Sequence, residues 1–135
     1  MHPLNRRSLL GALVSPLVAV GCVNIPSERQ MSWPEVYPLI KSGDAILLDV
    51  RLPQEVMGPI PRAAAIPYSR PQNGGDDSIF SMEAEMLADG RRIILVCAYG
   101  VRSIWAYHAL SKHGIDSASI KDGLEGVDYD DALLR

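Results

Sequence analysis

The feature that most constrains this chain is a short apolar run that ends at a cysteine and leads through a glycine-containing loop into a helical pattern. The run is Arg92–Val96, the cysteine is Cys97, and the helical pattern begins at Ile104. A run of this length predicts a buried strand, and apolar residues at helical spacing predict a helix after the loop. Strand, loop and helix in this order predict an α/β fold, in which functional loops lie beyond the carboxyl ends of parallel strands.

The surroundings predicted for Cys97 favour the ionised form of its thiol. Loop N–H groups and the positive end of the helix dipole would face the sulfur, and Arg102 supplies a cation nearby. Gly100 allows the backbone to turn its N–H groups inward. We therefore predict that Cys97 is a nucleophile. The alternatives are an inert core cysteine and, for Arg102, a surface cation that pairs with Asp49 or another acid.

Strand-like and helix-like segments alternate along the rest of the chain. Ala45–Val50 is a continuous apolar run with an acid near its end, which predicts a second buried parallel strand. Ser32 and Glu35 form a capping-box pattern for a helix that reaches about Lys41, and Pro38 predicts a kink or two short turns in it. Further segments are a short strand at 64–66, a surface loop at 69–78, a helix at 82–88 capped by Ser81, a helix at 104–113, a strand at 115–120 and a short helix at 129–135.

This alternation predicts one α/β domain over residues 31–135. Its central sheet is expected to be mostly parallel and flanked by helices on both faces, with right-handed crossovers. The chain has 135 residues, which suffices for one such domain.

The first 22 residues have the pattern of an export signal. A pair of arginines precedes the short apolar run Leu9–Gly21, which is too short to span a bilayer comfortably. The arginine pair resembles a twin-arginine signal, and Ala19–Cys22 resembles a bacterial lipobox. We therefore predict a signal peptide over 1–22, a lipid anchor on Cys22, a tether over 23–30 and a location on the periplasmic side of the cell envelope. Ordinary cleavage and a retained anchor are the alternatives.

Composition disfavours several function classes. The net charge of −3 argues against nucleic acid as a partner. Two cysteines and three histidines, scattered along the chain, form no metal-ligand pattern, so we predict neither a metal nor another cofactor. If Cys22 carries a lipid, Cys97 is the remaining thiol of an exported chain. A catalytic or sulfur-carrying role then explains a single thiol in an oxidising compartment.

The cysteine loop Cys97–Ser103 is one of several motifs in the chain. Asp49-Val50-Arg51 is a second, and it is followed by Glu55. The other motifs are Gly58–Ala63, Ala65-Ile66-Pro67 and Lys121–Gly126. Together they resemble the rhodanese-like (sulfurtransferase) family over about residues 31–127.

The resemblance implies an enzyme that moves sulfane sulfur from a donor such as thiosulfate to a thiol or cyanide acceptor, or to a protein acceptor. Cys97 would be the nucleophile and persulfide carrier, and Arg102 would stabilise the anionic donor or the thiolate. Asp49 and Arg51 would support the loop as a charge pair or a hydrogen-bond network. The remaining residues of the active-site loop are Ala98, Tyr99, Gly100, Val101 and Ser103.

Two other functions compete with sulfur transfer. Cysteine phosphatases of the cell-cycle type share the fold, but they place five residues between cysteine and arginine. Here four residues, Ala98 to Val101, separate Cys97 from Arg102. The smaller loop favours a sulfur-sized group over a phosphate. A non-catalytic binding module of the cell envelope is the second alternative.

Overall fold

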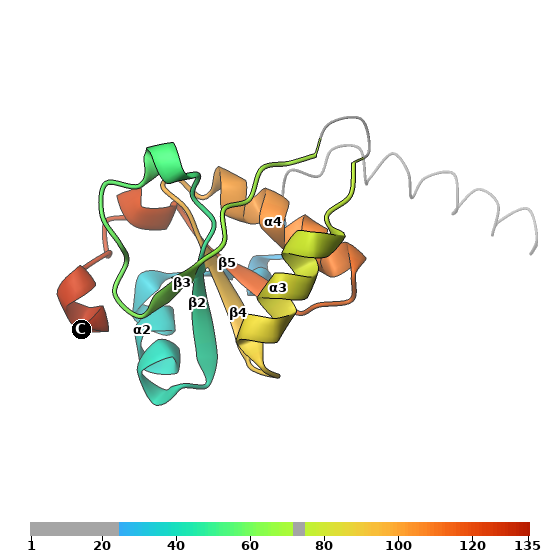
Figure 1. Ribbon diagram of the computed structural model, residues 1–135. Helices are drawn as coiled ribbons and strands as arrows, with labels where there is room; N and C mark the ends of the chain where they lie inside the picture. The colour runs from blue at the N-terminus through green and yellow to red at the C-terminus, as the bar shows by residue number, and fades with distance from the viewer. Residues whose placement is uncertain (1–24, 72–74) are drawn as a thin grey trace, which may run out of the picture.

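The computed structural model describes residues 25–71 and 75–135. In this part of the chain the sheet has five strands in the order β1-β5-β4-β2-β3, and every neighbouring pair is parallel (Figure 1). The strands are β1 (Gln30–Met31), β2 (Ala45–Asp49), β3 (Ala63–Ala65), β4 (Arg92–Val96) and β5 (Ser117–Ile120). The export segment predicted over 1–22, with the lipidation site Cys22, lies outside the described residues.

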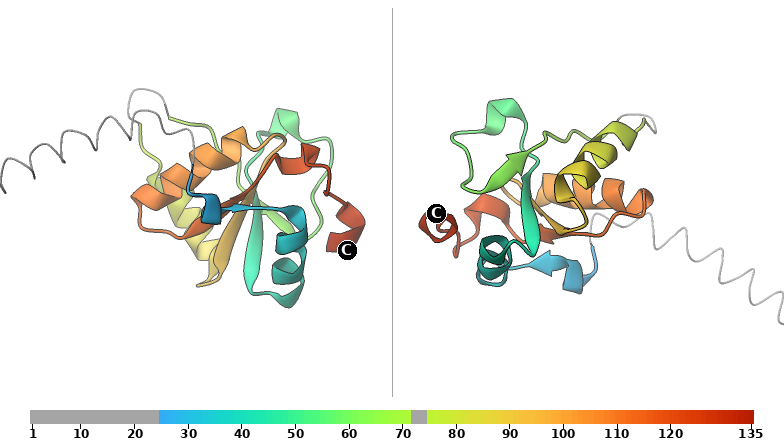
Figure 2. Two further views of the ribbon diagram at one scale, coloured as in Figure 1. Left: turned by 180° about the vertical axis from the view of Figure 1, so that it is seen from behind. Right: turned by 60° about the horizontal axis from the view of Figure 1, so that its bottom comes forward.

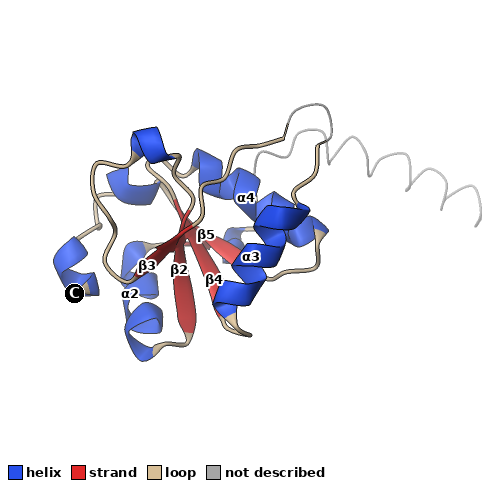
Figure 3. Cartoon of the chain, viewed as in Figure 1, coloured by secondary structure: helices blue, strands red, loops and turns tan. Residues whose placement is uncertain are grey.

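Helices cover both faces of the sheet. The α-helices are α2 (Trp33–Ser42), α3 (Ser78–Ala88) and α4 (Val101–Lys112), and the 3-10 helices are η1 (Ser27–Arg29), η2 (Pro53–Glu55), η3 (Gly123–Glu125) and η4 (Asp131–Leu134). Helix α2 packs on one face and α3 and α4 on the other (Figures 2 and 3). The predicted single α/β domain is thus confirmed. Over residues 25–71 and 75–135, no helix has the length and hydropathy needed to cross a membrane.

Strands β2 and β4 are apolar over most of their length because both of their faces are covered. Leu47 and Ile94 belong to the core under α2, whereas Leu48 and Leu95 belong to the core under α3 and α4. All four side chains are fully buried, and burial of each contributes about 1.5–3 kcal/mol. This explains why β2 and β4 appear in the sequence as continuous apolar runs rather than as alternating ones.

The register between β2 and β4 decides where the loops after them meet. Asp49 of β2 lies opposite Val96 of β4, and the Val50 N–H donates to the Val96 carbonyl at 3.0 Å. The segments that follow β2 and β4 therefore leave the sheet side by side, at the upper end of the domain in Figure 1. This is the end at which Cys97 follows β4.

Helix α2 follows the predicted signals at both ends. Glu35 accepts hydrogen bonds from the Ser32 N–H at 3.1 Å and from its hydroxyl at 2.9 Å, and Gly43 ends the helix at φ +81°. The two short turns expected around Pro38 are not formed, since Trp33–Ser42 is one continuous helix. Its buried face, which includes Val36, packs on the sheet. This packing supports the turn in which Pro38 has no backbone N–H to donate.

Helices α3 and α4 each begin earlier than the sequence patterns indicated. The Asp76 carboxylate accepts the Ser78 N–H at 2.9 Å and so starts α3 at Ser78, which leaves Ser81 buried inside the helix rather than capping it. Gly100 at φ +90° precedes the first residue of α4, Val101. The second half of the cysteine motif therefore belongs to the first turn of α4.

The segment predicted as a tether packs on the domain from Ile25 onward. Ile25 is buried, and Gln30 forms part of β1, which pairs with β5. Arg29 also forms an ion pair with Asp116 at 2.7 Å. In the structure the folded unit thus begins before residue 31.

Candidate active site

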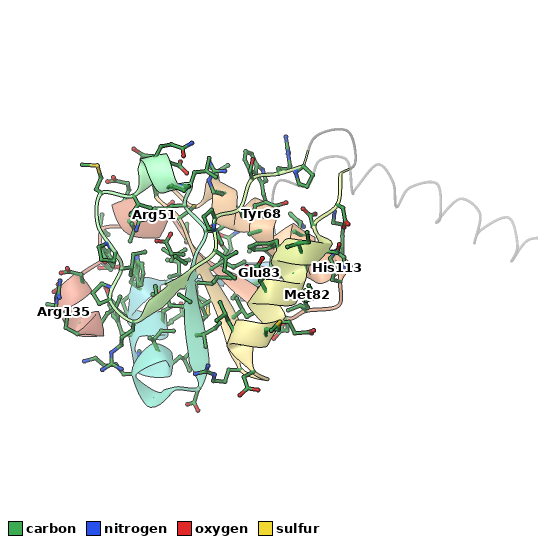
Figure 4. All side chains as sticks on the ribbon, viewed as in Figure 1. Arg51, Tyr68, Met82, Glu83, His113 and Arg135 are labelled. Atoms are coloured by element: carbon green, nitrogen blue, oxygen red, sulfur yellow. The ribbon has the colours of Figure 1, made fainter. Side chains whose placement is uncertain are left out.

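The candidate site lies beyond the carboxyl ends of β2 and β4, where the loop after β4 meets the start of α4. Cys97 is the first residue of this loop, and its side chain is only 3% exposed. Arg51 and Tyr68, labelled in Figure 4, lie at the same upper end of the domain. The sequence-predicted residues after β2 and β4 are thus brought together as the parallel sheet requires.

Backbone N–H groups surround the sulfur of Cys97. The Gly100 N–H donates to Sγ at 3.1 Å, and the Ser103 N–H donates at 3.4 Å. Ser103 lies in the first turn of α4, where N–H groups have no carbonyl of their own helix to bind. The conformation of Gly100, φ +90°, turns its N–H inward, and a Cβ at this position would lie 3.0 Å from the Asp122 nitrogen. Gly100 thus has positive φ and its N–H turned toward the sulfur.

The opposite side of the loop is fixed by η3. The carbonyls of Cys97 and Ala98 accept the N–H groups of Leu124 and Glu125, both at 3.0 Å. These two hydrogen bonds hold the backbone of the first half of the cysteine loop in place. Gly123 lies against the same carbonyls and leaves no room for a side chain.

Arg102 lines the site, but its guanidinium bonds to groups other than the Cys97 sulfur. Its Nε pairs with Glu55 at 3.1 Å, and its Nη1 donates to the Tyr68 carbonyl at 2.9 Å. The Leu52 N–H, which bonds the Glu55 carboxylate, and the nearby Arg102 lower the pKa of Glu55, so this carboxylate is ionised at neutral pH. Arg102 is thus paired with an acid, Glu55, which also lines the pocket; its stabilisation of a donor or thiolate stays a prediction.

Asp49 and Arg51 form a buried ion pair beside the loop. The Arg51 guanidinium contacts both carboxylate oxygens of Asp49, with Nη2 2.8 Å from one of them, and Nη2 also donates to the Gly58 carbonyl at 3.0 Å. Hydrogen bonding to Asp49 raises the pKa of Arg51. The charge pair is thus formed, and it fixes the connection after β2 through the Gly58 carbonyl; its support of the cysteine loop stays a prediction.

A small pocket of about 130 Å³ opens onto Cys97. Its lining comes from η2, the cysteine loop and the first two turns of α4, and consists of Glu55, Cys97, Ala98, Tyr99, Val101, Arg102 and Trp105. Tyr99 and Val101 are exposed, at 70% and 54%, and form the rim. Within the described ranges, no group of three His, Cys, Asp or Glu side chains is arranged to hold a metal ion.

Sequence reasoning missed three residues of this site. Trp105 was assigned only to a helical pattern, although it lies one turn after Val101 and so shares its helix face. Glu55 was treated as part of a structural motif. Gly123 gave no local signal of its contact with Cys97, because the two residues meet only after β5 pairs with β4.

Residues 32–128 match the family model described as the rhodanese-like domain. The chain belongs to the rhodanese-like domain family. The match covers nearly all of the described domain, from the cap of α2 to the residues after η3. The family that the motifs indicated is therefore confirmed.

Relatives of this rhodanese-like domain include a fungal enzyme and two solved structures. The adenylyltransferase and sulfurtransferase UBA4 of Yarrowia lipolytica is 39% identical over 98 residues, which are 72% of this chain and 23% of that protein. This chain thus spans about a quarter of that relative. A rhodanese-related protein of Thermoplasma volcanium is 26% identical, with a TM-score of 0.55 over 72% of this chain and 87% of that one. A rhodanese-like domain protein of Staphylococcus aureus is 25% identical, with a TM-score of 0.55 over 76% and 98%.

Proposed function

We propose that this rhodanese-like domain is a sulfurtransferase that carries sulfane sulfur as a persulfide on Cys97. The observation that carries the proposal is the position of the sulfur, at the base of a pocket and 3.1 and 3.4 Å from two backbone N–H groups at the start of α4. Such fixed donors stabilise negative charge without any rearrangement. They suit both a thiolate and the persulfide anion that replaces it.

The reaction has two displacement steps on sulfur. The Cys97 thiolate attacks the outer sulfur of thiosulfate, a new S–S bond forms, and sulfite leaves with the electron pair of the broken S–S bond. A thiophilic acceptor such as cyanide then attacks the terminal sulfur, which gives thiocyanate and regenerates the thiolate. Each step is a displacement by a nucleophile, so no external oxidant or reductant is needed. A thiol or a protein acceptor would enter in the second step.

The size of the loop supports sulfur over phosphate. Four residues separate Cys97 from Arg102, and Arg102 is held by Glu55 and the Tyr68 carbonyl rather than above the sulfur. A phosphoryl group needs a cation that clamps its oxygens.

We also propose that the domain works on the periplasmic side of the cell envelope, anchored by a lipid on Cys22. The support for this is the export and lipobox pattern at 1–22. Such an anchor would hold the domain near sulfur compounds that reach the envelope. Fatty-acid labelling of the full chain tests this proposal.

The persulfide proposal is tested by intact-mass measurement of the protein after incubation with thiosulfate, mercaptopyruvate or polysulfide. At least one donor is expected to raise the mass by that of one sulfur atom. Dithiothreitol should then remove the added mass. A protein that gains no sulfur from any of the three donors would instead support the non-catalytic binding module.

Glu55 is expected to weaken the binding of anionic donors. Glu55→Gln removes the negative charge that neutralises Arg102 and should lower the KM for thiosulfate about threefold, because one exposed ion pair is worth about 0.2–1 kcal/mol. Glu83→Gln, on the exposed face of α3 (Figure 4), makes the same charge change away from the pocket and should leave KM unchanged. Steady-state kinetics at low and high salt measure both variants. Equal KM values for Glu55→Gln and the wild type would contradict this role.

A further inference from the structure

A chain of three buried side chains leads from the sulfur of Cys97 into the sheet. Cys97 Sγ lies 3.5 Å from Ser103 Oγ, and Ser103 Oγ lies 2.7 Å from Ser119 Oγ. Ser103 and Ser119 are 0% and 2% exposed. The short distance between the two hydroxyls shows that they share a hydrogen bond, in which either oxygen can be the donor.

Ser119 comes from a strand that takes no other part in the site. It lies in β5, opposite Leu95 of β4, and its neighbours Ala118 and Ile120 belong to the core under α2. Because side chains alternate along a strand, Ser119 points to the other face, where α4 packs. Among the described residues, its one side-chain hydrogen bond is the bond to Ser103.

Each of the two serine hydroxyls has one hydrogen. The acceptors to which these two hydrogens are donated determine the role of Ser119. Ser103 Oγ has one hydrogen, and both the Gly100 carbonyl, at 3.2 Å, and Cys97 Sγ are in reach of it. When the thiol is protonated, its S–H donates to Ser103 Oγ. An ionised thiol has no hydrogen to donate, so Ser103 can then donate to the sulfur, and the Ser103 oxygen is free to accept from another donor.

Ser119 supplies that donor. With the Ser119 hydroxyl donating to Ser103, one of the two lone pairs of Ser103 is occupied, and the hydrogen of Ser103 is not used on Ser119 and is available to the sulfur. Without Ser119, the Ser103 hydroxyl loses the donor that polarises it, so the hydrogen bond that it can give to the ionised sulfur is weaker. Consecutive hydrogen bonds of this kind also strengthen one another in a buried site.

We propose that Ser119 is a positioning residue, which acts through Ser103 to favour the thiolate of Cys97. Its role in sulfur transfer rests on the function proposed above, but its effect on the thiolate does not. The reactivity of Cys97 toward iodoacetamide reports the thiolate directly and needs no sulfur donor. A failure of the Ser119 proposal is therefore distinguishable from a failure of sulfur transfer.

The test is a double-mutant cycle on the full chain with Ser119→Ala, Ser103→Ala and the double variant. The alkylation rate of Cys97 is measured as a function of pH by mass spectrometry of the Cys97 peptide. Ser119→Ala should slow alkylation at pH 7 about threefold and shift the pH profile upward, since Ser119 acts on the sulfur only through Ser103 and its loss removes only part of one hydrogen bond. In the Ser103→Ala background, Ser119→Ala should have no further effect.

Two further variants separate positioning from packing. Ser119→Thr keeps the hydroxyl and should restore the wild-type pH profile. Ser117→Ala is the matched control, because Ser117 lies on the same face of β5, is buried, and has no hydrogen-bond partner for its hydroxyl among the described residues. It should leave alkylation unchanged. An unchanged rate for Ser119→Ala, or an equal loss with and without Ser103, would overturn the proposal.

Discussion

A Cys97→Ser variant is expected to gain no sulfur from any donor. Its serine hydroxyl fits the same space and can accept the N–H groups of Gly100 and Ser103, so the fold should be retained. However, an alcohol is not ionised near neutral pH and does not displace sulfite from thiosulfate. Intact-mass measurement after incubation with donor should therefore show the unmodified mass, and thiocyanate formation should fall to the level of the uncatalysed reaction.

The second cysteine of the chain provides the matched control. Cys22→Ser makes the same chemical change at the predicted lipidation site and should leave sulfur loading intact while abolishing fatty-acid labelling. Cys97→Ser should show the reverse pattern. Sulfur loading that survives in Cys97→Ser but is lost in Cys22→Ser would show that Cys22 carries the sulfur and would contradict the proposed site.

Replacing Gly123 with alanine is expected to damage both the fold and the site. A Cβ at Gly123 would lie 2.1 Å from the Cys97 carbonyl oxygen and 2.7 Å from that of Ala98, and the residue has φ +58°. Neither obstacle is a flexible side chain, so the backbone of the cysteine loop must move. Overpacking together with a left-handed conformation should cost at least about 3 kcal/mol. Chemical denaturation measures this loss.

The same substitution should reduce sulfur loading about 100-fold, because a shift of about 1 Å at a reacting group costs that much. Gly43→Ala is the matched control, since Gly43 also has positive φ, at +81°, but a Cβ there meets no atom within 4 Å. It should cost about 1 kcal/mol from the backbone conformation alone and leave the loading rate unchanged. Equal losses of loading in the two glycine variants would show that η3 does not support the cysteine loop.

Much of the fold follows from local patterns. The buried strands β2 and β4 are continuous apolar runs, and the limits of α2 follow from Ser32, Glu35 and Gly43. These signals lie within a few residues of the structure they determine. The sequence did not indicate the early start of α3, because that start depends on a hydrogen bond from the Ser78 N–H to the Asp76 carboxylate. Ser81, a residue type common at helix N-caps, suggested a later start.

The site was predictable only where it is local in sequence. The bonds from Gly100 and Ser103 to Cys97 span three and six residues, and the loop motif already implied them. In contrast, the contacts of Arg102 with Glu55 and of Ser103 with Ser119 depend on the order of strands in the sheet. No periodicity or spacing in a single sequence identifies such partners, because they meet only after the sheet has formed.

The central claim, that Cys97 transfers sulfur and does not merely bind it, is tested most directly by discharge of the loaded protein. The protein is loaded with the donor that raises its mass, freed of excess donor, and mixed with cyanide. We predict that thiocyanate forms in an amount equal to the loaded chains, while the protein returns to its unloaded mass. Sulfur that stays on the protein in the presence of cyanide, or thiocyanate that forms equally from Cys97→Ser, would contradict the account.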